Sequence, residues 1–326
     1  MNAELFRRLL EKEFAGERWV REIRIRVGKP VRILDKDGEK LLYFEKAGGE
    51  VRFLWKDIEK TATGQNNGDV IRADRSLING IVEIFSRHSL YAYERELGQG
   101  FLTIRGGHRV GISGKAVTEG GQIRTIRDIS SLNLRIAHEV RGCASKLLPY
   151  LVCDGEFFDT LLIAPPGAGK TTLLRDLIRQ LSDGGSWGDG KNVSVVDERS
   201  EIAACFEGIP QCDLGMRTDV MDGCPKAEGM LMMLRSMAPQ ILAVDEVGDE
   251  EELMAMRYGM NCGCRLLATV HGADVRELMK RPAWKEILKE KLFSRYVVLS
   301  GVPAPGTIRE IFDEELRPME KWRKTV

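Results

Sequence analysis

Nine consecutive residues have the composition of a loop that could bind the phosphate groups of a nucleotide. They are Ala164, Pro165, Pro166, Gly167, Ala168, Gly169, Lys170, Thr171 and Thr172. Glycines let the backbone turn several N–H groups inward around phosphates, and Lys170 is placed to reach the β- and γ-phosphates of ATP. The Thr171 hydroxyl is expected to bind the accompanying Mg²⁺. One position departs from the usual G-x-x-x-x-G-K-[ST] pattern, because Ala164 stands in place of the first glycine.

Two adjacent carboxylates, Asp245 and Glu246, follow the apolar run 241–244 and could complete a site for ATP hydrolysis. We expect this run to be a strand beside the strand that precedes the phosphate loop. That placement would put Asp245 next to Mg²⁺, through a water molecule, and Glu246 one residue closer to the γ-phosphate. Glu246 could then orient or deprotonate the attacking water. The acidic stretch 249–252 is expected to be a solvated helix N-terminus instead.

Three further candidates also follow apolar runs: Asp197, Glu198 and His271. Ligands of parallel sheets gather at the carboxyl ends of the strands, so Glu198 competes with Glu246 for the water-activating role. The alternative for Glu198 is a structural ion pair with Arg199. For His271, sensing of the γ-phosphate competes with an ordinary structural role.

Basic residues are frequent in 101–141, where seven lysines and arginines occur with only three acidic residues. Phosphoryl transfer gains from an arginine that a neighbouring subunit delivers to the γ-phosphate. We prefer Arg124 and Arg127, which follow a Gly-Gly turn, as the arginines of such an interface. The alternative is an ordinary solvated face of a β-sheet.

The elements that must position these residues fall into two groups. In residues 1–140, short helical and alternating patterns with glycine turns predict an N-terminal α+β domain. In residues 141–326, strand-like runs alternate with helix-like segments, which predicts an α/β domain whose mostly parallel sheet has helices on both faces. Five apolar runs are expected to be its strands: 157–163, 193–196, 241–244, 266–270 and 296–299. The phosphate loop thus lies between a strand and a helix, which favours a nucleotide site over a chance glycine-rich turn.

The composition sets limits on the partners. The 326 residues include 49 Lys and Arg and 49 Asp and Glu, so the formal net charge is zero. Such balance gives no support to bulk binding of nucleic acid or of an anionic membrane. No secretory signal is visible, and no apolar run approaches the ~18–20 residues that span a bilayer, so a cytoplasmic protein is expected. The seven cysteines lack paired metal-ligand spacing and are expected to be structural thiols.

Several segments, in order along the chain, closely resemble the stage III sporulation protein AA family of endospore-forming bacteria. They are GGHRVGISG at 106–114, VVDERS at 195–200, GMRTDV at 215–220, RSMAP at 235–239, VDEVG at 244–248 and TVHG at 269–272. That family is similar to the ATPases of type II and type IV secretion systems and of type IV pili. The resemblance implies a RecA-like ATPase core and a hexameric ring. It also matches Asp197 with Glu198, and His271, to the acidic and histidine motifs that flank the nucleotide in those ATPases.

The resemblance further implies a place of work and a set of partners. The protein would act at the mother-cell face of the forespore membranes, held there by other stage III sporulation proteins, and would energise a secretion-like channel. Two alternatives stay open on the residues alone. A nucleic-acid motor uses the same core and predicts hydrolysis stimulated by DNA or RNA, although no direct nucleic-acid partner is expected here. A small-molecule kinase would need an acceptor pocket that the sequence does not identify.

Overall fold

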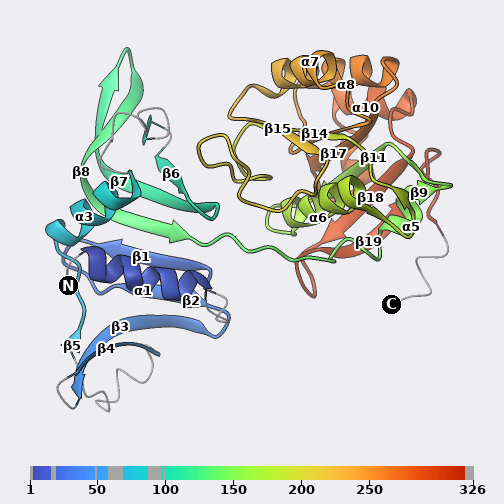
Figure 1. The fold of residues 1–326 in the computed structure, drawn as a ribbon. Coiled ribbons are helices and arrows are strands. Elements are labelled where there is room, and N and C mark those ends of the chain that lie inside the picture. Colours follow the sequence, from blue (N-terminus) through green and yellow to red (C-terminus); the bar gives the residue numbers. More distant parts are fainter. Residues whose placement is uncertain are drawn as a thin grey trace. The chain divides into compact units, whose positions relative to one another are not determined.

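The computed structural model of the protein describes residues 3–15, 20–47, 50–57, 69–86, 97–98 and 100–319. The chain folds into two compact units, Met1–His138 and Glu139–Val326 (Figure 1). Each unit has its own sheet and its own apolar core. The candidate nucleotide residues from 164 onward all belong to the second unit.

The first unit is built on an eight-stranded antiparallel sheet. Its strands run in the order β4-β3-β2-β1-β8-β7-β6, and β5 pairs with β3. Their bounds are Glu22–Arg26 (β1), Arg32–Asp35 (β2), Gly38–Ala47 (β3), Glu50–Asp57 (β4), Asp69–Val70 (β5), Phe101–Ile104 (β6), His108–Glu119 (β7) and Gln122–Arg135 (β8). Alternation in β1 buries Ile23 and Ile25 in one core with side chains of helices α1 (Ala3–Ala15) and α3 (Arg75–Phe85).

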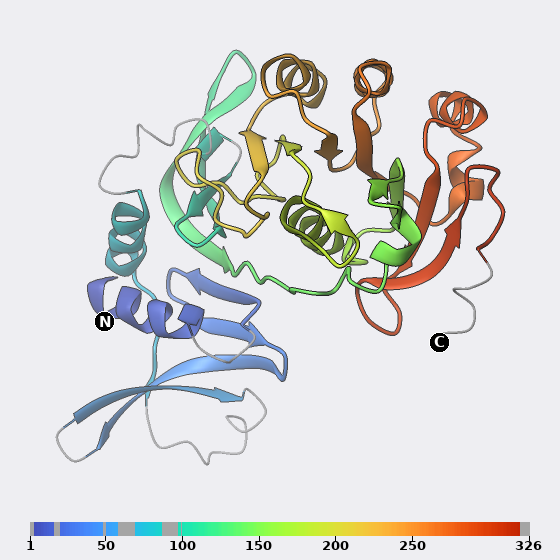
Figure 2. The ribbon, with the colours of Figure 1, turned by 45° about the vertical axis from the view of Figure 1, so that its right-hand side comes forward.

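The second unit has a seven-stranded sheet in the order β15-β14-β16-β17-β11-β18-β19 (Figure 2). All neighbours run parallel except β19, which is antiparallel to β18. The strands are β11 (Thr160–Ala164), β14 (Val193–Asp197), β15 (Thr218–Asp222), β16 (Ile241–Val244), β17 (Arg265–His271), β18 (Arg295–Ser300) and β19 (Thr307–Phe312). The predicted α/β domain with a mostly parallel sheet is therefore confirmed.

Short hairpins and helices complete the second unit. The hairpins are β9 (Val152–Cys153) with β10 (Glu156–Phe157), and β12 (Gly184–Gly185) with β13 (Gly188–Asp189). The helices are α5 (Leu148–Leu151), α6 (Lys170–Asp183), α7 (Lys226–Ser236), α8 (Glu250–Asn261), α9 (Val275–Leu278) and α10 (Pro282–Lys289). No helix among the described residues is both long and apolar enough to span a membrane.

Helices cover both faces of the second sheet. Successive residues of a strand point to opposite faces, so neighbouring residues of β11 show which helices pack on each face. Leu162 of β11 packs in a core with α5 and α6, whereas Leu161 packs in another core with α7, α8 and α10. Figures 1 and 2 both show α7, α8 and α10 across the sheet from α6. All residues of β11 and β14 are buried, which explains why these strands read as continuous apolar runs.

The strand order differs from the expected one next to the phosphate loop. We expected β16 beside β11, but β17 lies between them and pairs with both. The prediction was wrong because apolar runs of similar length carry no information about which strands become neighbours. The edge strands β15 and β19 were also missed, since polar residues interrupt both, and the run 157–163 is divided between β10 and β11.

Candidate functional site

The phosphate loop connects the end of β11 to the first turn of α6. Gly167 and Gly169 have φ angles of +71° and +84°, a region that glycine enters without steric penalty. A Cβ at Gly169 would lie 2.6 Å from the backbone nitrogen of Gly306, so only glycine fits there. The Gly306 amide donates to the Ala168 carbonyl at 2.7 Å, which fixes the loop against the β18–β19 connection. The loop therefore has the glycine-dependent shape that its sequence predicts.

Lys170 begins α6, and its ammonium group lies against the acidic pair. Its Nζ is 3.0 Å from Oε1 of Glu246 and 3.3 Å from Oδ1 of Asp245, and the residue is only 9% exposed. The structure thus brings Lys170 together with two carboxylates that lie 75 and 76 positions further along the sequence. A buried lysine needs such partners, because desolvation penalises an uncompensated charge. The phosphates of a nucleotide could replace these carboxylates as partners of Lys170.

Asp245 is held by hydroxyl groups from two different elements. Thr171 Oγ1 donates to Oδ2 of Asp245 at 2.8 Å, and the buried Thr269 of β17 donates to Oδ1. The intervening strand β17 thus connects the acidic pair to the phosphate loop, so the unexpected strand order still assembles the expected site. Thr171 and Asp245 offer oxygen ligands of the kind that Mg²⁺ prefers when phosphates and water supply the others. Within the described residues, no cluster of three or more His, Cys, Asp or Glu side chains forms a separate metal cage.

Glu246 has a backbone conformation that is unusual for its residue type, with φ at +52°. Its amide donates to Thr269 Oγ1 at 2.9 Å, and its carbonyl accepts from Lys226 Nζ at 2.7 Å. Its carboxylate bridges two cations, with Oε1 on Lys170 and Oε2 at 3.1 Å from Nη1 of Arg199. With this turn, the Glu246 carboxylate lies against Lys170 of the phosphate loop.

Asp197 and Glu198, at the end of β14, have different surroundings. The Asp197 carboxylate is buried and accepts the amides of Glu201, Ile202 and Ala203, each at 2.9 Å. Burial raises the pKa of Asp197 to about 6, although these three amides act to lower it. This carboxylate holds the loop that carries Arg199. The expected alternative of a Glu198–Arg199 ion pair is not what the structure shows.

Lys226, which the sequence reading did not single out, connects several of these segments. Its Nζ lies 3.7 Å from Oε2 of Glu198 and 2.8 Å from Oε1 of Glu252. Glu252 also accepts the amides of Gly248 and Asp249 and is buried, so the prediction that 249–252 is a solvated helix N-terminus was wrong for this residue. The helix start itself is confirmed, with Asp249 as the N-cap of α8. A lysine at the start of a helix gives no sequence signal for such a role.

His271 is exposed at the carboxyl end of β17, in register with Ala164 of β11. Its Nδ1 is 3.4 Å from the Ala164 carbonyl oxygen, at the start of the phosphate loop. The parallel pairing thus places this imidazole at the same sheet edge as Lys170 and the acidic pair. Its role toward the γ-phosphate stays a prediction.

Arg124 and Arg127 lie on β8 of the first unit, and both are exposed. Arg124 forms an ion pair with Glu119 at 2.6 Å across the β7–β8 hairpin. Arg127 is opposite Lys115 in the register of the same hairpin. Like charges that face each other across two strands repel, so this pair does not stabilise the hairpin. Delivery of either arginine to a nucleotide stays a prediction.

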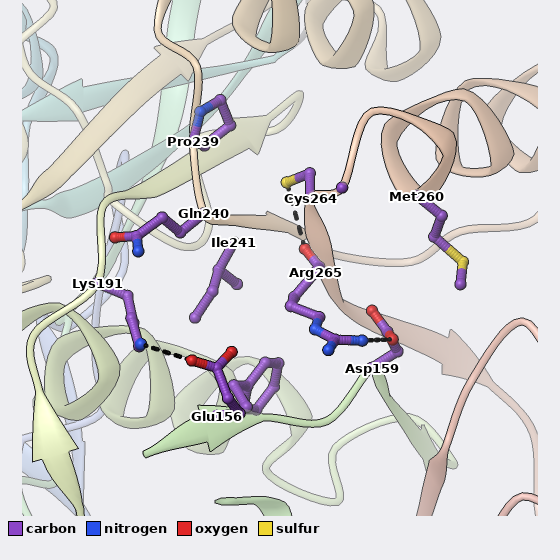
Figure 3. Close-up of a pocket in the computed structure, with 11 residues that line it drawn as sticks. Glu156, Asp159, Lys191, Pro239, Gln240, Ile241, Met260, Cys264 and Arg265 are labelled. Atoms are coloured by element: carbon purple, nitrogen blue, oxygen red, sulfur yellow. Dashed lines mark hydrogen bonds and ion pairs between the residues drawn. The ribbon is translucent and has the colours of Figure 1, made fainter. Parts of the chain in front are cut away.

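A cavity of about 400 Å³ lies at the opposite, amino-terminal edge of the second sheet (Figure 3). Ion pairs cross its walls, with Lys191 3.4 Å from Glu156 and Arg265 3.1 Å from the buried Asp159. This cavity is separate from the phosphate loop, because β11 runs from Thr160 on its side to Ala164 on the other. The narrow pocket beside the acidic pair is lined instead by residues that follow β14 and β16, including Glu198, Arg199 and Glu246, and by Lys226 of α7.

Comparison with known proteins gives one family and one fold. The model of the family "Sporulation stage III, protein AA" matches residues 1–318. Stage III sporulation protein AA of Bacillus subtilis (strain 168) is 41% identical over 305 residues, which cover 93% of this chain and 90% of that protein.

Two solved structures are similar in fold. The ATPase DotB of Legionella pneumophila has a TM-score of 0.58 at 16% identity, covering 97% of this chain and 82% of that one. The pilus retraction motor PilT, solved with bound ADP, has a TM-score of 0.53 at 11% identity, covering 91% and 78%. These likenesses establish that the chain shares the fold of these two proteins, with the smaller domain preceding an α/β core.

Proposed function

This chain belongs to the sporulation stage III protein AA family, and from that premise we propose that it hydrolyses Mg-ATP to power a secretion-like channel complex between mother cell and forespore. Family membership supports the sporulation role, and the fold supports a nucleoside triphosphatase. The proposal goes further in naming the reaction, the residues and the process that the reaction drives.

One observation carries the proposal: the phosphate-loop lysine, the adjacent threonine and both members of the acidic pair converge on one another. Lys170 contacts Asp245 and Glu246 within 3.3 Å, and Thr171 contacts Asp245 at 2.8 Å. A glycine-rich turn without a nucleotide role has no need of a lysine and two carboxylates in contact behind it. Hydrolysis of a Mg²⁺-bound triphosphate needs this set of groups.

Each residue then has a defined task. The backbone N–H groups of 167–172 and the Lys170 ammonium bind the β- and γ-phosphates, and the N-terminus of α6 adds its partial positive charge. Thr171 and Asp245 would hold Mg²⁺, whose charge would neutralise that of the phosphates when it is bound. Glu246 accepts a proton from water as the water oxygen bonds to the γ-phosphorus. The bond from that phosphorus to the β,γ-bridging oxygen breaks, and ADP and inorganic phosphate leave.

The contacts favour Glu246 over Glu198 as the main base. Glu246 Oε1 is 3.0 Å from the lysine that binds the γ-phosphate, whereas the ion-pair partner of Glu198 is Lys226. Glu198→Gln is therefore the matched control for Glu246→Gln. The first variant should retain most of its turnover. The second should bind ATP but hydrolyse it at least ~100-fold more slowly, because a general base typically contributes ~10²–10⁴-fold to the rate.

Lys170→Ala tests the central claim. The variant should keep the fold, lose ATP binding and release no inorganic phosphate, and a strain carrying it should fail to sporulate. Titration calorimetry with Mg-ATP and a phosphate-release assay measure the two effects, with circular dichroism as the check on folding. Undiminished phosphate release by the folded variant would refute the proposal.

The ring and its arginines form the finer part of the proposal. We place Arg124 and Arg127 at an interface where one subunit completes the site of the next, in a hexamer bound through other stage III proteins to the mother-cell face of the forespore membrane. Mixing Arg127→Ala subunits with Lys170→Ala subunits should recover some activity. At some interfaces the first variant supplies an intact phosphate loop and the second supplies an intact Arg127. Absence of recovery at every mixing ratio would contradict an arginine supplied by the neighbour.

A further inference from the structure

Glu246 is surrounded by three cations from three separate elements. Lys170 of α6 contacts carboxylate Oε1, Arg199 after β14 contacts carboxylate Oε2, and Lys226 of α7 contacts the backbone carbonyl. A general base must present one free oxygen to water and must not rotate away from it. Lys170 covers the oxygen that could become free, and Arg199 holds the other carboxylate oxygen in place.

The two carboxylate contacts differ in what a nucleotide does to them. Lys170 is the phosphate-loop lysine, so a bound triphosphate attracts its ammonium group away from Oε1. Arg199 is outside the phosphate loop, and nothing in that exchange removes it from Oε2. ATP binding therefore frees Oε1 while Oε2 stays held. The oxygen that is released is the one that faced Lys170, on the side where the γ-phosphate will lie.

Lys226 acts on the backbone of the same residue. Its side chain is only 12% exposed, and its ammonium donates to the Glu246 carbonyl while pairing with Glu252 and, at longer distance, with Glu198. The two short contacts use two of the three ammonium protons, and Glu198 at 3.7 Å is an ion-pair partner outside hydrogen-bonding distance. Since φ at Glu246 is +52°, its turn needs support from outside, and Lys226 ties it to the buried start of α8.

We propose that Arg199 and Lys226 are positioning residues, which aim Oε1 of Glu246 at the attacking water once ATP has drawn Lys170 away. Arg199 fixes the carboxylate, and Lys226 fixes the turn. In this proposal both residues act through Glu246 and not by binding the phosphates. The inference rests on the proposed function in taking Glu246 as the base.

Arg199→Gln is the primary test, because its ion pair is exposed and its loss should leave the fold stable. We expect kcat to fall ~5- to 10-fold, the change that ~1 kcal/mol of lost orientation produces. KM for ATP should stay within about twofold, since the residue does not hold the nucleotide. Arg199→Lys should recover part of kcat. Arg276→Gln, which removes another exposed arginine of the same unit, is the matched control with unchanged kinetics.

A double-variant cycle separates positioning from direct action. If Arg199 works only through Glu246, adding Arg199→Gln to Glu246→Gln should slow hydrolysis no further. If the losses of kcat in the two single variants multiply in the double variant, the inference is overturned. A rise in KM for ATP with unchanged kcat in Arg199→Gln would also overturn it and make Arg199 a phosphate-binding group. Wild-type kcat in Arg199→Gln would overturn it as well.

Lys226→Met completes the test, with Lys226→Arg as the variant that keeps the charge and secures folding. The methionine variant should lose kcat ~10-fold or more through misplacement of Glu246, and the arginine variant should lose less. Equal, undiminished kcat in both would overturn the role of Lys226. These results differ from failure of the proposed function, which appears as full turnover by Glu246→Gln or Lys170→Ala alone.

Discussion

Replacement of Thr269 by valine should loosen the turn that carries Asp245 and Glu246. Thr269 is fully buried in β17, and its hydroxyl contacts both residues of the acidic pair. Valine keeps the β-branched shape that suits a strand and removes only the hydroxyl. The substitution therefore tests hydrogen bonding with little change of volume.

The expected loss can be worked out contact by contact. Donation from Thr269 Oγ1 to the Asp245 carboxylate is a hydrogen bond to a charged group, worth ~1.5–3 kcal/mol. The Glu246 amide loses its 2.9 Å partner but keeps Asp245 Oδ1 at 3.0 Å, so its share of the loss is small. We expect the free energy of unfolding to fall by about 2–3 kcal/mol. For a unit of this size the melting temperature should drop by roughly 5–10 °C.

Thermal unfolding followed by circular dichroism measures the stability, and phosphate release measures the turnover. Thr269→Ser is the control, since it keeps the hydroxyl and should hold kcat close to that of the wild type. Thr269→Val should lose kcat more than ATP affinity, because the turn aims Glu246 without binding the nucleotide. If Thr269→Val has the melting temperature and the kcat of the wild type, the Thr269 hydroxyl does not hold the acidic pair.

Three further predictions concern other parts of the second unit. Gly169→Ala should lower the melting temperature more than Gly167→Ala, because only the first places a Cβ against backbone, 2.6 Å from Gly306 N, and scanning calorimetry can compare them. The pKa of Asp197 is raised from 3.8 to about 6, so its contribution to the free energy of unfolding is full below pH 3.8 and is lost as the pH rises through 6. Asp197→Asn should therefore remove a pH dependence of roughly 3 kcal/mol, which urea unfolding between pH 4 and 7.5 can measure. Trp284→Ala should cost about 3–5 kcal/mol of unfolding free energy in the same assay, since this side chain fills the core beneath α10.

The sequence was most informative where one short segment carries a whole function. The loop 164–172 has its glycines, lysine and threonines in a fixed order, so its shape could be predicted from those residues, and its position after a strand from the apolar run before it. The apolar runs that became β14, β16 and β18 were equally clear, since strands buried on both faces have no alternation to obscure them.

The sequence was least informative about contacts between distant segments. Nothing in the run 266–270 indicates that β17 separates β11 from β16, because pairing depends on the packing of the whole sheet. The left-handed turn at Glu246 has no sequence signal either, since glutamate does not favour it. The sequence suggested Arg199 only as an alternative ion-pair partner of its neighbour Glu198, and the structure pairs it with Glu246 after the adjacent strand β16.

The contact between Gly169 and Gly306 has a consequence for how the molecule responds to its ligand. The Gly306 amide donates to the carbonyl of Ala168, and Gly169 next to it leaves no room for a side chain, so a change of shape in the phosphate loop would disturb this contact. Any such change must be transmitted to the β18–β19 connection, and through it to the antiparallel margin of the sheet. A protein bound at β19 would then respond to nucleotide binding and release without contacting the nucleotide.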